Sequence, residues 1–186
     1  TTDLAVFSGG SLVHTAVLSI GGNHVTNDVA VGLRTPFLEA EKVKLRHGCA
    51  LTSMAQEEQT IEVSSIGSGA DRILSRQILT EIIEPRVEEI FSLIKQEIEK
   101  SGYEDLISSG IVLTGGSAIM EGMPELAEQL GPLAPDAETP REPQALREAA
   151  ARFLLASDRP MLLILDDLQH AEVETVALLE CVGRLA

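Results

Sequence analysis

The chain has 186 residues, of which 44% are hydrophobic and only 3% aromatic, and it carries a formal net charge of −15. This charge argues against nucleic acid or an anionic membrane surface as the main partner. No apolar run approaches the roughly 20 residues that a membrane-spanning helix needs. Cys49 and Cys181 lack the spacing of a metal site or a redox motif, which is typical of free thiols in a reducing compartment. We therefore expect an acidic, cytoplasmic protein with an aliphatic core.

The composition changes near residue 131. Residues 1–131 contain all four Lys, 13 of the 14 Ile and 14 of the 15 Gly, whereas residues 132–186 hold five of the eight Pro. Four of these prolines fall within twelve residues, a density that excludes helix and central strand alike. The pattern predicts an α/β domain at 1–131, a Pro-rich linker at 132–144 and a segment of different origin at 145–186.

The first part opens with a predicted β-hairpin. Residues 4–7 and 12–20 are apolar and rich in β-branched side chains, and a Ser-Gly-Gly-Ser turn separates them. Gly21 and Gly22 end the second strand, and a helical pattern follows with Asn23 as its expected N-cap. A strand, a Gly-Gly turn and a helix N-terminus in this order can present backbone N–H groups to an anion, although a plain tight turn also explains two glycines.

A second helix is predicted to end at Gly48, its expected C-cap. Glu41 and Lys44 are three residues apart on this helix and share a face. From the spacing alone, a solvated ion pair explains them.

Residues 60–66 alternate like a half-buried strand, and a helical pattern of Ile and Leu begins at Ile73. Pro85 is expected to interrupt that helix and to occupy the first turn of a new one. Three arginines stand out among acidic residues here, either balancing those charges or forming a docking face for an acidic or C-terminal peptide; they are Arg72, Arg76 and Arg86.

Residues 110–130 contain a buried strand that ends in Thr-Gly-Gly-Ser, followed by a helix from about Gly122. Gly115 and Gly116 at the carboxyl end of a central strand suit a flat ligand that lies directly on the backbone. Because the chain has no Gly-x-x-x-x-Gly-Lys-Ser/Thr motif, the predicted site would hold a nucleoside and is no P-loop.

The last part of the chain, residues 145–186, is predicted to form a helix, an apolar strand and a second helix. The strand, MLLILDD, ends in Asp166 and Asp167. An apolar strand that ends in two acids has the pattern of a Walker B element. In such an element Asp166 would hold Mg²⁺ through water, and Asp167 would lie near the attacking water. The longer string LLILDDLQHAEVETVALL resembles the Walker B region of LuxR-type transcriptional regulators and related signalling ATPases, with His170 where they usually carry Trp. This resemblance implies a partial P-loop-type ATPase segment.

The first part as a whole resembles a different family. Thr1-Thr2-Asp3 is similar to the end of the Asp-x-Gly-Gly-Gly-Thr-Thr-Asp phosphate loop of actin-like ATPases, and Gly115-Gly116-Ser117 to their adenosine motif. Within that superfamily, SIGGNHVTNDVAVGLRTPFLEAEKVKLRHGCA, EIIEPRVEEIF and GIVLTGGSAIMEGMPELAE resemble the FtsA family of bacterial cell-division proteins, in order and over about residues 1–130. The resemblance implies the second half of an actin-like (RNase H-like) ATPase fold, with the chain starting in mid-motif.

The resemblance also implies the site residues. A nucleotide, ATP with Mg²⁺ in the complete parent protein, would contact Thr1, Thr2, Gly21, Gly22, Glu41, Lys44, Gly115, Gly116 and Ser117. FtsA-type proteins polymerise into actin-like protofilaments and recruit the tubulin-like FtsZ to the inner face of the cell membrane at the division site. The FtsZ C-terminal tail would dock on Arg72, Arg76 and Arg86, because guanidinium groups pair well with carboxylates. The family's membrane link is a C-terminal amphipathic helix, which this chain does not show.

The leading hypothesis is therefore an FtsA-type ATP-binding adaptor, here with one wall of its nucleotide cleft and no expected ATPase activity by itself. Three alternatives remain open at this point: a fragment of a LuxR-type ATP-dependent regulator, an adaptor similar to the type IV pilus assembly protein PilM, and a merged or truncated reading frame.

Overall fold

The computed structural model describes residues 1–8, 11–56, 58–66, 70–103, 111–128 and 161–166. The strands are β1 (Thr2–Ser8), β2 (Ser11–Leu18), β3 (Thr60–Val63), β4 (Arg72–Ser75), β5 (Ile111–Gly115) and β6 (Met161–Asp166). The α-helices are α1 (Gly22–Leu33), α2 (Phe37–His47), α3 (Arg76–Ser101) and α4 (Met123–Ala127), with short 3₁₀ turns η1 (Thr52–Met54) and η3 (Ser117–Ile119). The expected α/β class is confirmed for these residues. The linker at 132–144 and the two tail helices lie outside them.

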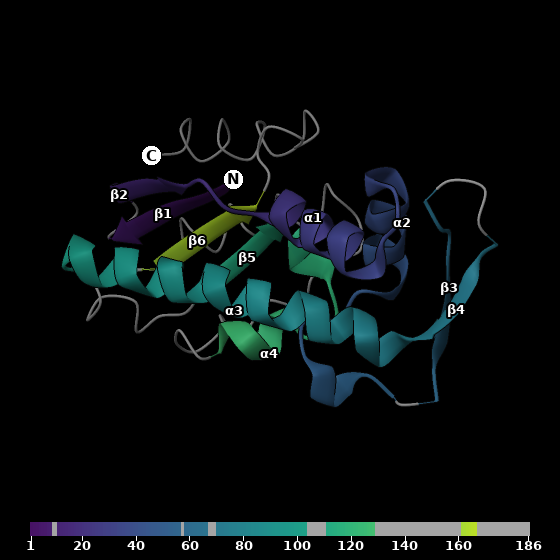
Figure 1. Ribbon diagram of the computed structural model, residues 1–186. Helices are drawn as coiled ribbons and strands as arrows, with labels where there is room; N and C mark the ends of the chain where they lie inside the picture. The colour runs from purple at the N-terminus through teal and green to yellow at the C-terminus, as the bar shows by residue number, and fades with distance from the viewer. Residues whose placement is uncertain (9–10, 57, 67–69, 104–110, 129–160, 167–186) are drawn as a thin grey trace, which may run out of the picture.

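The main sheet has four strands in the order β2-β1-β6-β5 (Figure 1). β1 and β2 form the predicted antiparallel hairpin, in which Leu4 faces Ala16, and a register shift follows Val6. β6 lies between β1 and β5, antiparallel to the first and parallel to the second. A strand from the compositionally distinct last part of the chain thus joins the two strands of the first part.

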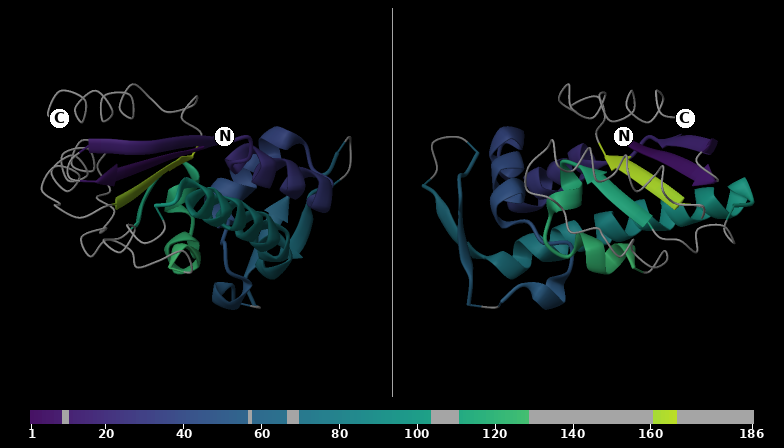
Figure 2. Two further views of the ribbon diagram at one scale, coloured as in Figure 1. Left: turned by 90° about the vertical axis from the view of Figure 1, so that its left-hand side faces the viewer. Right: turned by 180° about the vertical axis from the view of Figure 1, so that it is seen from behind.

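Helix α3 connects this sheet to the rest of the described fold. It packs against β2 at one end, against α1 along its middle and against β4 at its start. Figure 2 shows α3 running along one side of the sheet and on towards the small β3–β4 sheet. Its buried side chains follow a helical period and form much of the core; they are Leu79, Ile83, Val87, Ile90, Phe91, Ile94 and Ile98.

The prediction of two helices around Pro85 is wrong, because α3 continues through this proline over 26 residues. A proline inside a helix removes one backbone hydrogen bond and disfavours the preceding turn. The apolar positions on both sides of Pro85, Ile83 and Val87, are nevertheless fully buried on one continuous face. Tertiary packing of that face compensates for the lost hydrogen bond.

The start of α3 also differs from the prediction. Ile73 and Leu74 belong to β4, which pairs antiparallel with β3, so they are not helical. The helix begins after Ser75, whose hydroxyl accepts a hydrogen bond from the backbone N–H of Gln77, an N-cap that the sequence pattern of Ile and Leu concealed.

Two helix ends on α1 and α2 can be compared with the predicted caps. The predicted N-cap Asn23 is wrong: α1 begins two residues earlier, at Gly22, with Gly21 in the N-cap position, where its N–H contacts His24 Nδ1 at 3.3 Å. Gly48 is the C-cap of α2, as predicted, but its backbone is extended and not left-handed.

No helix among the described residues is long and apolar enough to span a membrane.

Candidate functional site

The predicted nucleotide loops meet at one end of the main sheet. In the strand registers, Asp166 at the carboxyl end of β6 lies opposite Thr2 on one side and opposite Gly115 on the other. The start of α1 lies at the same end of the sheet, beside the tips of β5 and β6 (Figure 1). Carboxyl ends of parallel strands facing a helix N-terminus form the usual position of ligand sites in α/β folds.

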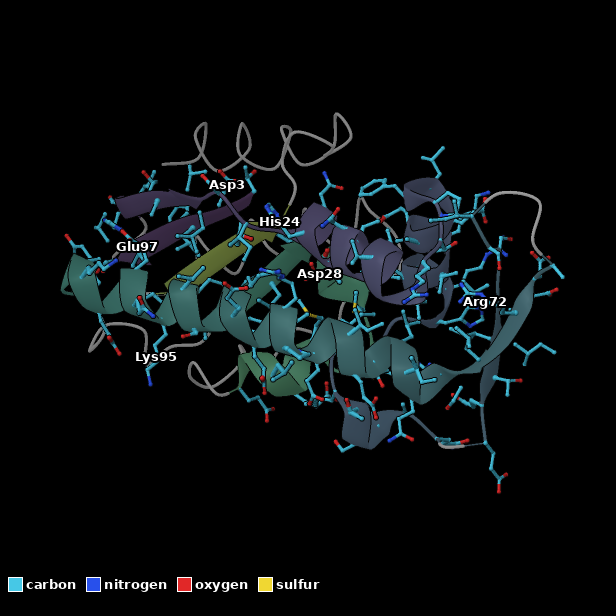
Figure 3. All side chains as sticks on the ribbon, viewed as in Figure 1. Asp3, His24, Asp28, Arg72, Lys95 and Glu97 are labelled. Atoms are coloured by element: carbon cyan, nitrogen blue, oxygen red, sulfur yellow. The ribbon has the colours of Figure 1, made fainter. Side chains whose placement is uncertain are left out.

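Thr2 links β1 to the Gly21–Gly22 turn through a side-chain hydrogen bond. Its side chain is buried, and its hydroxyl donates a hydrogen bond of 2.8 Å to the carbonyl of Ile20, directly before Gly21. Thr1 is half-buried, and its hydroxyl donates to Asp3 Oδ2 at 3.4 Å. Figure 3 shows Asp3 and His24 in the middle of the molecule, near the end of the sheet that lies beside α1. The buried Thr2 hydroxyl therefore positions the turn in this structure, and its contact with a phosphate stays a prediction.

Glu41 and Lys44 form a buried network with the Gly-Gly turn. Lys44 Nζ lies 2.8 Å from Glu41 Oε2, 2.9 Å from Thr26 Oγ1 and 3.3 Å from the Gly22 carbonyl. The Lys44 side chain is only 5% exposed and that of Glu41 is 33% exposed, so the solvated ion pair suggested by spacing alone is wrong. Thr26 also contacts Glu41 and, at 3.1 Å, the Gly22 carbonyl. The network fixes α2 against the first turn of α1.

The Thr-Gly-Gly-Ser turn leaves space where a flat ligand was expected. Gly115 has a φ of 103°, which favours glycine because L side chains rarely adopt this conformation. Gly116 has an ordinary φ of −61°, and a Cβ atom added there would meet nothing within 4 Å. Ser117 follows as the first residue of η3. Packing and backbone conformation therefore give no reason for glycine at position 116, whereas a ligand on the backbone would.

Each of the three arginines is engaged by partners within the chain. Arg72 donates from Nη2 to the Leu33 carbonyl, and Figure 3 shows its side chain extending from the β3–β4 sheet towards the helices. Arg76 donates from Nε to the His47 carbonyl at 2.8 Å, and its Nη1 and Nη2 contact Gln59 and Glu121.

Arg86 joins α3 to α1. Its Nε lies 2.5 Å from Asp28 Oδ2, and its Nη1 contacts Glu89. Figure 3 shows Asp28 between the two helices. The hydrogen bond that Arg86 donates to Asp28 raises the pKa of Arg86 above its ordinary value, against the opposing effect of burial. An acidic peptide at this position would have to compete with two carboxylates.

Two hollows lie beside Arg72 and Arg76. One, of about 590 Å³, is lined by Arg72 and Arg34 together with Val31 and Ile66, which are 70% and 67% exposed. The other, of about 420 Å³, lies beside Arg76 and Glu121. The first combines basic and apolar side chains, whereas an opposite charge already faces the arginine in the second.

The predicted Mg²⁺ carboxylates are only partly described. Asp166 ends β6 at the candidate site, and Asp167 lies outside the described residues. Within the described ranges, no group of three or more His, Cys, Asp or Glu side chains could hold a metal ion. The Mg²⁺ role of the pair remains a prediction.

The sequence did not point to Thr26 or Ile20 as parts of this site. Thr26 follows Gly22 by one helical turn, a spacing that places a side chain over the preceding carbonyl. That spacing is common in helices, and only the approach of Lys44 from α2 makes it informative. The Ile20 carbonyl carries no sequence signal, because any residue supplies one.

Comparisons with known proteins identify the chain's relatives. The profile of the family described as "Cell division protein FtsA" matches residues 1–155. The curated Cell division protein FtsA of Pseudomonas aeruginosa PAO1 is 53% identical over 130 residues, which are 70% of this chain and 31% of that protein. The protein of the same name from Escherichia coli K12 is 42% identical over 70% of this chain and 33% of its own length. The one from Neisseria meningitidis serogroup B is 38% identical over 76% of this chain and 34% of its own length. The chain spans about a third of the length of these relatives.

Proposed function

Because the chain belongs to the FtsA family of cell-division proteins, we propose that its described residues form the second half of an actin-like fold and one wall of an ATP site. The complete protein would bind ATP with Mg²⁺, assemble into protofilaments and recruit FtsZ to the inner face of the membrane at the division site. A cell-division function follows from the family, and the nucleotide and the partners are the proposal.

The observation that carries the nucleotide proposal is the convergence at one end of the sheet. The Gly21–Gly22 turn, the start of β1 and the Gly115–Ser117 turn come from three separate parts of the sequence, and open space lies over Gly116. The N-terminus of α1 favours negative charge through the helix dipole. This wall would back the nucleoside and offer the helix N-terminus to the phosphates.

One wall supplies few of the contacts that hold phosphates and Mg²⁺. Each missing charge-assisted hydrogen bond costs about 1.5–3 kcal/mol, so the loss of three lowers affinity by several orders of magnitude. We therefore expect weak binding of Mg·ATP and no measurable hydrolysis by this chain alone.

The experiment is a titration of the ¹⁵N-labelled chain with Mg·ATP up to about 10 mM, a range suited to weak binding. We expect amide shifts centred on Gly21, Gly22 and the Gly115–Ser117 turn. Gly116→Val, which fills the open space, should remove these shifts with little change in thermal stability, and Gly116→Ala should weaken them. Shifts that are absent, that lie elsewhere or that persist in Gly116→Val would reject the site.

The FtsZ-tail proposal is tested through the charges around Arg86. Glu89→Gln removes one of the two carboxylates on this arginine, so binding of an acidic FtsZ tail peptide should tighten if the peptide docks there. Glu88→Gln is the matched control, because Glu88 is an exposed neighbour and the substitution makes the same change in net charge. Fluorescence anisotropy with a labelled peptide measures both. Equal effects would show that only the overall charge matters and would remove Arg86 from the docking site.

A further inference from the structure

The arrangement of the main sheet leads to one inference that does not depend on nucleotide binding. β1 and β5 are not paired with each other, and β6 is the strand that joins them. It pairs with β1 from Thr2↔Asp166 to Phe7↔Met161 and with β5 from Ile111↔Leu162 to Gly115↔Asp166. β6 is thus a central strand, although it comes from the part of the chain that the composition sets apart.

We propose that the gap between β1 and β5 is a strand-acceptor site and that residues 161–166 are its donor strand, inserted from within the same chain. The site accepts a short apolar strand that runs antiparallel to β1 and parallel to β5. A covalent strand of this chain fills it, so the two compositionally distinct parts fold as one sheet.

The backbone of β1 and β5 explains why the gap needs an occupant. Leu4, Val6 and Ile111 are 3%, 1% and 0% exposed, so the strands that carry them lie in the core. Backbone N–H and C=O groups in a buried strand must be hydrogen-bonded, and leaving them unpaired is costly. Without β6, the described part of the sheet would reduce to the β1–β2 hairpin and a separate β5.

The sequence of β6 suits this position. MLLILD is apolar without the alternation of a half-exposed strand, which is typical of a strand buried on both faces. It contains no Pro or Gly, so every residue can donate to the ladder. A charged residue follows only at its end, at the register position beside Thr2.

The direction of β6 brings its end to the candidate site. β6 runs antiparallel to β1, so its last residue, Asp166, pairs with Thr2 at the start of β1. On its other side, Asp166 pairs with Gly115 at the end of β5.

The test is disulfide formation between paired strand positions in the full chain, with Cys49→Ala and Cys181→Ser as background. Ala5 and Leu163 are direct partners, so the Ala5→Cys/Leu163→Cys variant should form an intramolecular disulfide in high yield. The matched control, Ala5→Cys/Leu162→Cys, shifts the partner by one residue. Because successive side chains point to opposite faces of a strand, it should not form this bond. Circular dichroism of the reduced variants checks that both remain folded.

The outcomes separate clearly on a non-reducing gel. A monomeric disulfide in the Leu163 variant alone supports strand insertion within one chain. Equal yields in both variants, or none in either, would overturn it, because the strand would then not be held in register. A disulfide-linked dimer would also overturn it, since the donor strand would then come from a second copy. Failure of nucleotide binding would leave this test unaffected.

Discussion

Lys44→Met tests whether the Glu41–Lys44 pair is part of the fold or a surface feature. Lys44 Nζ contacts a carboxylate, a hydroxyl and a backbone carbonyl, and its side chain is 5% exposed. Methionine keeps most of the apolar volume of the lysine stem and removes only the ammonium group. The variant therefore isolates the polar contacts.

The expected loss of folding stability depends on which groups lose their partner in Lys44→Met. Thr26 still contacts the Gly22 carbonyl at 3.1 Å, so that pair survives the substitution. Glu41 loses its cation, which costs 3–5 kcal/mol for a fully buried pair. Its side chain is one-third exposed, so water restores part of its solvation and the cost falls to about 2 kcal/mol. With a urea m-value of about 2 kcal/mol/M, the unfolding midpoint should drop by about 1 M.

The same helix provides a matched control. Lys42 Nζ lies 2.6 Å from Glu39 Oε1 with the same three-residue spacing, but its side chain is 59% exposed. Lys42→Met should therefore cost at most about 0.5 kcal/mol. A double-mutant cycle with Glu41→Gln isolates the pair itself and should give a coupling energy of about 1–2 kcal/mol. Equal midpoints for Lys44→Met and Lys42→Met would refute the reasoning that burial separates the two pairs.

Three further predictions follow from single contacts. Gly122→Ala should destabilise the fold by about 1–2 kcal/mol, seen as a lower Tm, because Gly122 has a φ of 83° and the added Cβ would lie 3.0 Å from the Leu51 backbone nitrogen. Arg86→Met should lower stability in urea by about 1 kcal/mol, since it leaves the part-buried Asp28 unpaired; an unchanged midpoint would contradict this. Burial raises the pKa of the Cys49 thiol above its ordinary 9.0, so the folded state holds this proton more tightly and loses stability as the pH rises beyond 9. In a Cys181→Ser background, Cys49 should then react slowly with a thiol reagent at pH 8 and rapidly in urea, and fast reaction of the native chain would refute its burial.

The secondary structure could be predicted from the sequence where it depends on residues that are close together in the chain. The β1–β2 hairpin, the strand before Gly115 and the Gly48 end of α2 all follow from periodicity and turn residues within a few positions. Family resemblance then placed Gly21, Gly116 and Lys44 in one predicted site, and the structure brings the first two to the same end of the sheet as Thr2.

The misses share a physical cause, which is tertiary contact. Ile73 and Leu74 have a helical pattern, yet pairing with β3 makes them a strand. Pro85 lies within α3 because the apolar face around it is buried against the core. Spacing shows that Glu41 and Lys44 share a helix face, but only the approach of α1 decides that Lys44 is buried and Lys42 is not.

The position of β6 shows most directly what composition cannot predict. Lys, Ile and Pro usage separates residues 132–186 from the rest, and this difference favoured a separate segment. Strand pairing, however, is made by backbone N–H and C=O groups, which every residue except proline supplies alike. A strand in the central position between β1 and β5 needs only a suitable length, apolar side chains and no proline. Residues 161–166 have these properties regardless of their origin. A boundary in composition is therefore weak grounds for a boundary in folding wherever an apolar strand lies beyond it, and the Ala5–Leu163 disulfide measures which of the two this chain has.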